Sequence, residues 1–448
     1  MNQPRKNRAF NRRQQYLRAI ATVASLILGA QGQAASFTWD AGGDGFLYND
    51  GVNWSTDTVP SNSAATELVL GDGAGGLTGE QLIFMETARL VGKIRFAADS
   101  DATYSLEDLG GRISISAGSF SGVGIRNDAS ALRSINVAIT IPGSGASQTW
   151  DAASGDLGIN GTVNLNNNTV TVAGANNTTI GGIVSGAGGL AKTGAGSLSL
   201  SGANTFAGGL SVSGGTAILG ADAAPGSGSI ALSGGTLQAS GNRTIANPVS
   251  IGGGGGTVGG SGQLTLSGLI TGGTLTKSGS GILTIAGDNN TFSTLNANAG
   301  TTVLNSSGAN ALADTAGVSL GGGTLDVRQN ETAGVLTLAS GSSTLALELG
   351  AGRTLTFSSL VLSGGTLAVT GHGGSFGVAS TDNKLFVTGD LGPGFIDEIS
   401  FTGVGSRSIQ LDSGEIVPVP EPTAIASAFG LLGFALWRFR AKRNQAIV

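Results

Sequence analysis

The chain has 448 residues, of which 79 are Gly, and charged residues make up only 11%. Its hydrophobic content of 40% and formal net charge of −5 exclude an intrinsically disordered chain, which combines low hydrophobicity with high net charge. The absence of cysteine excludes a disulfide framework and a thiolate metal site. Abundant Gly with few aromatic residues predicts a β-rich chain with many tight turns.

The charges are unevenly distributed along the chain. Both ends are basic, whereas residues 35–422 hold 13 Lys and Arg against 28 Asp and Glu. An acidic body of low charge density does not bind nucleic acid by neutralising phosphates, so a nucleic-acid partner is not expected.

Residues 1–35 have the pattern of a signal peptide. A basic stretch leads into the apolar run 19–30, and small residues follow. We expect a signal helix here and cleavage at Ala34 or Ala35. The alternative is an N-terminal membrane anchor, but the apolar run is short for the ~20 residues that a span needs.

Residues 36–147 are predicted to form an N-terminal β-rich region that begins with clustered acidic residues. Asp40, Asp44 and Asp50 lie among glycines in "WDAGGDGFLYNDG" and are a weak candidate for Ca²⁺. The spacing of an EF-hand is absent, so we favour turn-forming Asp residues.

Tryptophans occur at three positions of the body. Trp39, Trp54 and Trp150 could stack on a sugar or could fill the core. We favour the second interpretation.

Residues 148–375 are repetitive. Apolar and polar residues alternate in "SLSLSGANTF" and in similar stretches, which predicts half-buried strands. Residues 188–204 align without a gap with residues 273–289, so that Lys192 pairs with Lys277 and Asn204 with Asn289. A unit of one strand and one turn buries its apolar side only by stacking, with Leu, Ile and Val inward and Ser and Thr outward.

The predicted fold class is therefore all-β, a right-handed parallel β-helix with about 20 residues per coil. Gly and Asn are expected at corners that need a positive φ. The alternative is an array of β-sandwiches, which we disfavour because charged and large aromatic residues are scarce.

The segment "GAGGLAKTGAGSLSLSGANTFAGGLSVSGGTAIL", residues 186–219, resembles the autotransporter-associated β-strand repeat. Lys-Thr-Gly, Leu-x-Leu-x-Gly and Gly-Ala-Asn-Thr-aromatic stand in the order of that repeat. The second copy has one extra residue before Phe292 and lacks the Gly-Gly pair that follows. The resemblance implies a parallel β-helix stalk at the cell surface.

Catalytic groups are scarce in the sequence. His372 is the one histidine, and it lies between glycines in a predicted loop. Lys192 and Lys277 lack the preceding Gly and the following helix of a phosphate-binding loop. We therefore expect no cofactor, no metal other than the weak Ca²⁺ candidate, and no enzymatic activity.

The C-terminal part contains a predicted β cap, residues 376–416, followed by three short signals in residues 417–443. These are the triplet Pro420, Glu421 and Pro422, an apolar helix at 423–437, and the basic residues Arg438, Arg440, Lys442 and Arg443. The apolar run is at the short limit for a transmembrane helix, and the basic residues would stay cytoplasmic under the positive-inside rule.

Triplet, apolar run and basic cluster together resemble the PEP-CTERM sorting signal. The resemblance implies that an exosortase, a membrane-embedded protease, recognises and removes the segment. It also implies a Gram-negative host that makes exopolysaccharide.

These observations predict an exported, non-enzymatic protein of the cell surface or extracellular matrix, with a structural or adhesive role in the envelope or the exopolysaccharide biofilm. Its partners would be the export machinery, the exosortase, the cytoplasmic membrane transiently, and exopolysaccharide. Two alternatives stay open, namely a polysaccharide-active β-helix enzyme and a permanently tail-anchored surface stalk.

Overall fold

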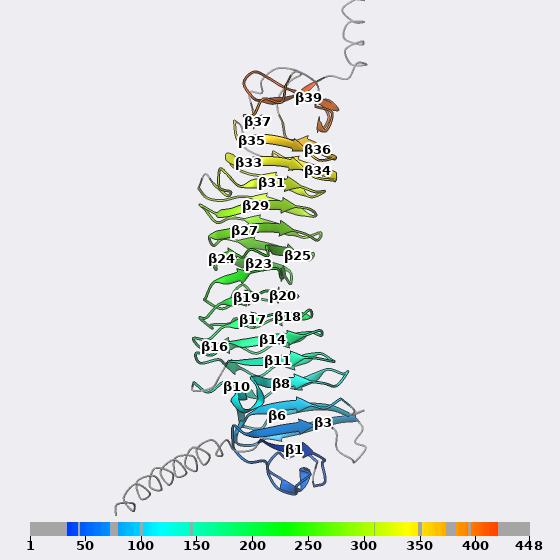
Figure 1. The fold of residues 1–448 in the computed structure, drawn as a ribbon, viewed down its shortest axis with the longest axis vertical. Helices are drawn as coiled ribbons and strands as arrows, with labels where there is room; N and C mark the ends of the chain where they lie inside the picture. The colour runs from blue at the N-terminus through cyan, green and yellow to red at the C-terminus, as the bar shows by residue number, and fades with distance from the viewer. Residues whose placement is uncertain are drawn as a thin grey trace, which may run out of the picture.

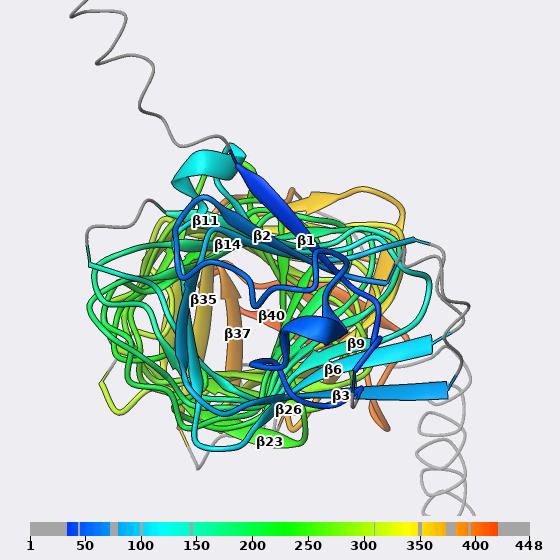
Figure 2. The same ribbon diagram turned by 90° about the horizontal axis from the view of Figure 1, so that it is seen from below.

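The computed structural model describes residues 34–43, 45–71, 79–98, 102–143, 147–308, 310–347, 352–372, 382–392 and 396–419. These residues form one elongated parallel β-solenoid. Figure 1 shows the coils stacked along the long axis, and Figure 2 shows the sides of the coil around the core. The predicted all-β solenoid is confirmed, and its right-handed sense stays a prediction.

In the N-terminal half each coil has up to three strands, one on each side of the solenoid. The first side contains β1 (Ala35–Trp39), β2 (Thr66–Leu70), β5 (Lys93–Phe96), β8 (Val123–Asn127), β11 (Gln148–Ala152), β14 (Val170–Gly174), β17 (Leu190–Lys192), β19 (Leu210–Val212), β21 (Ile230–Leu232) and β24 (Val249–Ile251). The second side contains β3 (Gly79–Met85), β6 (Ala102–Asp108), β9 (Arg133–Ile135), β12 (Leu157–Ile159), β15 (Thr178–Ile180), β18 (Ser197–Leu200), β20 (Thr216–Leu219), β22 (Thr236–Ala239) and β25 (Gly256–Gly259).

The third side is made of two separate sheets. The first contains β4 (Ala88–Val91), β7 (Arg112–Ile115), β10 (Ala138–Thr140), β13 (Val163–Asn164) and β16 (Val184–Ser185). The second contains β23 (Asn242–Ile245), β26 (Gln263–Leu266), β28 (Ile282–Ile285), β30 (Thr301–Leu304), β32 (Thr324–Val327), β34 (Gly341–Ala346), β36 (Gly365–Thr370) and β38 (Ile399–Phe401).

The first and second sides merge at β27 (Ile270–Lys277). Ile270 pairs with Val249 of β24, and Leu275 of the same strand pairs with Gly256 of β25. The merged sheet continues through β29 (Thr291–Ala297), β31 (Gly317–Leu320), β33 (Glu331–Leu338), β35 (Thr354–Leu362) and β37 (Lys384–Val387).

Short elements lie beside the coils and at the ends. They are the 3-10 helices η1 (Gly51–Asn53) and η2 (Ala117–Phe120) and the antiparallel pair β39 (Arg407–Gln410) and β40 (Ile416–Val419). η1 lies close to β1, where Trp39 forms an isolated antiparallel bridge with Trp54.

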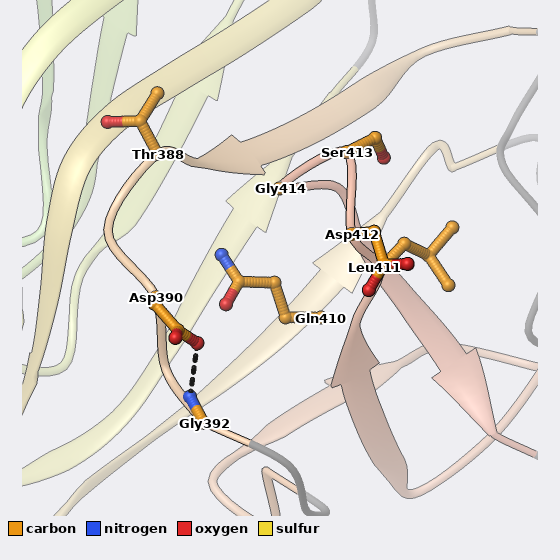
Figure 3. A pocket seen from close by; sticks show the side chains of 8 residues that line it. All are labelled: Thr388, Asp390, Gly392, Gln410, Leu411, Asp412, Ser413 and Gly414. Atoms are coloured by element: carbon orange, nitrogen blue, oxygen red, sulfur yellow. Dashed lines mark hydrogen bonds between the residues drawn. The ribbon is translucent and has the colours of Figure 1, made fainter.

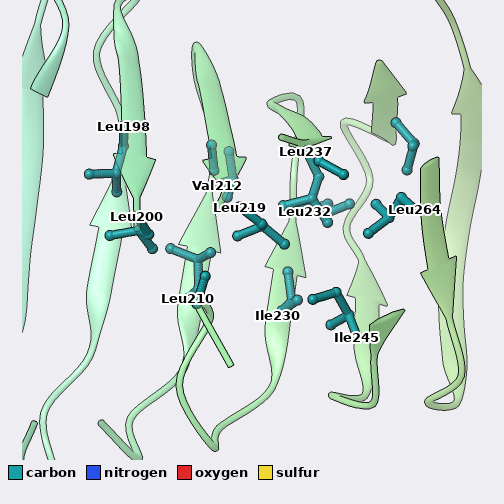
Figure 4. Packing of buried hydrophobic residues seen from close by; sticks show 14 of the residues in the cluster. Leu198, Leu200, Leu210, Val212, Leu219, Ile230, Leu232, Leu237, Ile245 and Leu264 are labelled. Carbon is teal, nitrogen blue, oxygen red and sulfur yellow. The ribbon is translucent and has the colours of Figure 1, made fainter. Parts of the chain in front are cut away.

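Columns of aliphatic side chains form the core. One column runs through the paired residues Val170, Leu190, Leu210, Ile230, Val249 and Ile270, which are all buried. Figure 4 shows part of this core, in which leucines and isoleucines of successive coils pack on one another. The predicted inward aliphatic and outward Ser and Thr pattern is confirmed, as in β18, where Leu198 and Leu200 are buried and the two serines are partly exposed.

Coil length matches the prediction only in the middle of the chain. Leu190, Leu210 and Ile230 are register partners 20 residues apart. Near the N-terminus the register pairs Ala35 with Thr66 and Ile94 with Ile125, so these coils have 31 residues. In the coil of Ile94, the second-side strand β6 has seven residues and β7 forms the third side, whereas the coil of Leu190 has only the four-residue β18 after β17.

Backbones of successive coils approach closely at the corners. A Cβ atom added at Gly182 would lie 2.0 Å from the carbonyl oxygen of Gly161, and one added at Gly161 would lie 2.0 Å from that of Val137. Glycine is required here because the obstacle is backbone, which cannot move without shifting a coil. The predicted use of Asn at positive φ also holds at Asn166 and Asn289, with φ of 50° and 56°.

We predict that Gly182→Ala lowers the free energy of unfolding by about 1–3 kcal/mol, the usual cost of overpacking. Gly253→Ala is the matched control, since an added Cβ there has no atom within 4 Å. Urea unfolding followed by circular dichroism measures both variants. Equal stability of the two variants would contradict the close contact at the corner.

Candidate functional site

The two repeat copies each place a lysine in an inward column. Lys192 stands between Val172 and Val212 in the register, and Lys277 stands between Val258 and Ala297. Both lysines are only 1% exposed. The sequence already contained this signal, because the alternation Leu-x-Lys assigns each lysine to the same side of its strand as the preceding leucine.

Each lysine ammonium donates to backbone carbonyl oxygens at a corner, three for Lys277 and one for Lys192. The Lys277 Nζ donates to the carbonyl oxygens of Ser278 and Gly279, at 2.7 Å each, and of Ala299 at 3.3 Å. The Lys192 Nζ donates to the carbonyl oxygen of Gly194. Each lysine therefore satisfies carbonyls where the chain leaves a strand, and burial lowers the pKa of both lysines.

An asparagine in each copy links three successive coils. Asn204 Oδ1 accepts from the Val184 amide at 2.8 Å, and its Nδ2 donates to the Ala224 carbonyl at 2.7 Å. Asn290 Oδ1 accepts from the Ile270 amide at 2.7 Å, and its Nδ2 donates to the carbonyls of Gly287 and Ala311. Both asparagines are buried.

The alignment of Asn204 with Asn289 was wrong by one residue. Asn290 makes the bonds equivalent to those of Asn204, and both asparagines precede Thr and a buried Phe. The second copy accommodates its extra residue at Asn289, which has a positive φ.

The two copies lie on different sides of the solenoid. In the first copy, Leu190 is on the first side in β17 and Leu198 on the second side in β18. In the second copy, Leu275 is in the part of β27 that continues the second side, and Leu283 is on the third side in β28. The motif is thus displaced by one side around the coil, while its local contacts are preserved.

The predicted tryptophan positions lie in the core. Trp39, Trp54 and Trp150 are fully buried, as we favoured over sugar stacking. Trp39 and Trp54 contact each other edge-on with ring centroids 5.0 Å apart, and Tyr48 packs on Trp54 at 5.1 Å.

The acidic residues near the N-terminus stabilise turns. Asp40 accepts from the amide of Gly42 at 3.2 Å and Asp50 from that of Val52 at 3.1 Å. Asp44 lies outside the described residues. Among the described residues no group of three His, Cys, Asp or Glu side chains is arranged to hold a metal ion. The Ca²⁺ site therefore stays an untested prediction.

A polar cavity of about 620 Å³ lies near the C-terminal end (Figure 3). Asp390 and Asp412 line it together with Gln410. Gln410 Nε2 donates to the carbonyls of Val387 and Gly389, and its Oε1 accepts from the Leu391 amide. Gln410 connects the segment after β37 to β39. Its hydrogen bonds therefore indicate a structural role for this side chain.

The predicted processing sites lie largely outside the described residues. These sites are the signal segment before Ala34, the triplet Pro420, Glu421 and Pro422, the apolar helix 423–437 and the basic cluster Arg438, Arg440, Lys442 and Arg443. Ala34 and Ala35 are exposed at the start of the described chain, and Ala35 begins β1. Within the described part of the chain, no helix is both long and apolar enough to cross a membrane.

Residues 190–216 and 275–293 match the passenger-associated-transport-repeat family model. These matches contain the lysines and asparagines described above, and they confirm the two predicted repeat copies. Comparisons with curated proteins and with solved structures found no match.

We predict that Asn290→Ala lowers the free energy of unfolding by about 2–4 kcal/mol. It leaves the buried Ile270 amide and two carbonyls without their partner, and each such group costs ~1–3 kcal/mol, partly recovered by relaxation. Asn305→Ala, at an exposed position, is the control and should change stability by less than ~0.5 kcal/mol. A loss of equal size in both variants would refute the linking role.

The buried lysines should also make stability depend on pH. Between their lowered folded pKa and the ordinary value of 10.5, the unfolded chain binds more protons, so stability rises with pH. We expect the double variant Lys192→Met, Lys277→Met to show a smaller rise between pH 7.5 and 10. Urea midpoints across this range measure the difference, and Lys384→Met is the control. Identical slopes in the wild type and the double variant would contradict buried, desolvated lysines.

Proposed function

We propose that this chain is an exported, passenger-like surface protein whose solenoid has a structural or adhesive role in the envelope or the exopolysaccharide matrix. The proposal depends on one observation. The chain forms a parallel solenoid, and its two buried Lys and Asn motifs lie within the residues that match the passenger-associated-transport-repeat model. An elongated stack of coils offers a long lateral surface, which suits a stalk or matrix component.

The surface composition supports an adhesive or structural role. Outward positions on neighbouring coils carry small hydroxyl residues, as in the register partners Thr236, Thr257 and Thr276. Hydroxyl groups can exchange hydrogen bonds with glycan hydroxyls while keeping the surface soluble. Exopolysaccharide is therefore the partner class that we propose.

We further propose that an exosortase cleaves the chain near Pro420, Glu421 and Pro422, after the apolar helix 423–437 has held it transiently in the cytoplasmic membrane. The support is the order of triplet, apolar run and basic residues in the sequence. The solenoid would then lie on the outer side of that membrane, because the basic cluster would stay cytoplasmic.

Intact mass and C-terminal peptide mapping of the protein from native cells and culture medium test this proposal. We expect loss of everything after about Pro422, with any added mass identifying an attached group. A variant with alanine at all three triplet positions should retain the C-terminus. Wild-type protein that ends at Val448 and is found only in the membrane would contradict sorting and leave the tail-anchored stalk.

The polysaccharide-active alternative has its own test. When exopolysaccharide from the producing bacterium is incubated with the purified exported protein, the chain length of the polysaccharide should stay unchanged. Depolymerisation that a single carboxylate substitution abolishes would contradict the non-enzymatic proposal.

A further inference from the structure

His372 fastens the last coil to the coil before it. It lies two residues after the end of β36, and its ring packs against Phe401 of β38 with centroids 4.7 Å apart. Its Nδ1 bonds to the carbonyl oxygen of Asn383 at 3.0 Å, just before β37. Asn383 in turn donates to the carbonyls of Leu347 and Gly371. One imidazole thus contacts the last residue of β38, Phe401, and the residue just before β37, Asn383.

The hydrogen bond to Asn383 fixes the tautomer of the neutral ring. A carbonyl oxygen only accepts, so Nδ1 carries the proton and Nε2 of the neutral ring does not. Nε2 is buried and has no hydrogen-bond partner within the described chain. Protonation at Nε2 would therefore create a buried, charged N–H without an acceptor among the described residues, which is unfavourable.

The surroundings of the imidazole shift its pKa in both directions. Burial lowers the pKa of His372, whereas the Asn383 carbonyl and the carboxylates of Glu415 and Asp382 raise it. Burial has the largest effect on the pKa of His372, so the closed arrangement favours the neutral ring.

We propose that His372 is a pH-sensitive fastener of the C-terminal cap, defined as residues 382–392 and 396–419. The neutral imidazole holds the last coil closed, and the protonated imidazole releases it. In the open cap the imidazole regains its ordinary pKa of 6.5, so the open state binds more protons than the closed state below that pH. Opening thus becomes more favourable as the pH falls.

The cap leads directly into the predicted sorting signal, so opening of the cap would affect that segment. β40 ends at Val419, directly before Pro420. An acidic medium would loosen the element that leads into the predicted sorting triplet. The pH-dependent contact of His372 does not depend on the proposed exosortase cleavage, so either proposal can be wrong while the other holds.

Hydrogen exchange measured by mass spectrometry between pH 5.0 and 7.5 tests the proposal on the full-length protein. After correction for the intrinsic exchange rate, peptides that contain 365–372 and 383–387 should lose protection by up to about tenfold per pH unit below pH 6.5. Peptides from β19 to β22 serve as the internal control and should stay constant. A local measurement is needed because Glu331, whose pKa is raised by burial, titrates elsewhere in the solenoid.

Two variants remove the titration in different ways. His372→Gln keeps a donor for the Asn383 carbonyl, and His372→Phe keeps a ring against Phe401. Both should flatten the pH dependence of the peptides that contain 365–372 and 383–387, whatever their baseline protection. A wild-type cap without pH dependence would overturn the proposal, and so would a dependence that persists in both variants.

Discussion

The close stacking of coil on coil is the constraint on which the rest of this structure depends. Parallel strands pair at a spacing of ~4.8 Å, and at the corners the backbones of successive coils approach just as closely. At Gly182 the carbonyl of Gly161 leaves no room for a Cβ atom. Close contacts of this kind account for many of the glycines, because a Cβ atom there would meet the backbone of the preceding coil.

The same stacking leaves polar backbone groups inside each corner, and specific side chains satisfy them. Lys277 donates to three carbonyls, and Asn290 connects the coil of Ile270 with that of Ala311. Buried polar groups cost free energy when they lack a partner, so these side chains allow corners that glycine alone would leave unsatisfied. They explain why the repeat contains Lys and Asn beside its aliphatic residues.

Much of the fold could be predicted because the alternation of apolar and polar residues is a local signal. Leu198 and Leu200 were assigned to the core from this pattern, and the family match confirmed the repeats. The displacement of the second copy by one side could not be predicted in this way. A motif that spans one strand, one corner and the next strand makes the same local contacts at any corner.

Other features also depend on longer-range contacts. The lysines were identified as repeat positions but were not assigned to the core, although the alternation of the strand already directed them inward. Asn290 was missed because an ungapped alignment cannot place an inserted residue at Asn289. The role of His372 depends on Phe401 and Asn383, which lie 29 and 11 residues away in sequence, so no local pattern indicated it.

The displacement of the second repeat copy is tested most directly by disulfide crosslinking, since the chain has no cysteine of its own. Thr276 is the register partner of Thr257 on the second side, whereas Ser250 of the first side pairs with Thr271. Cysteines at 257 and 276 should therefore crosslink readily, because paired positions at ~4.8 Å lie within disulfide range. Cysteines at 250 and 276 should not. Crosslinking of the second pair in place of the first would contradict the displaced motif and the stacking on which it depends.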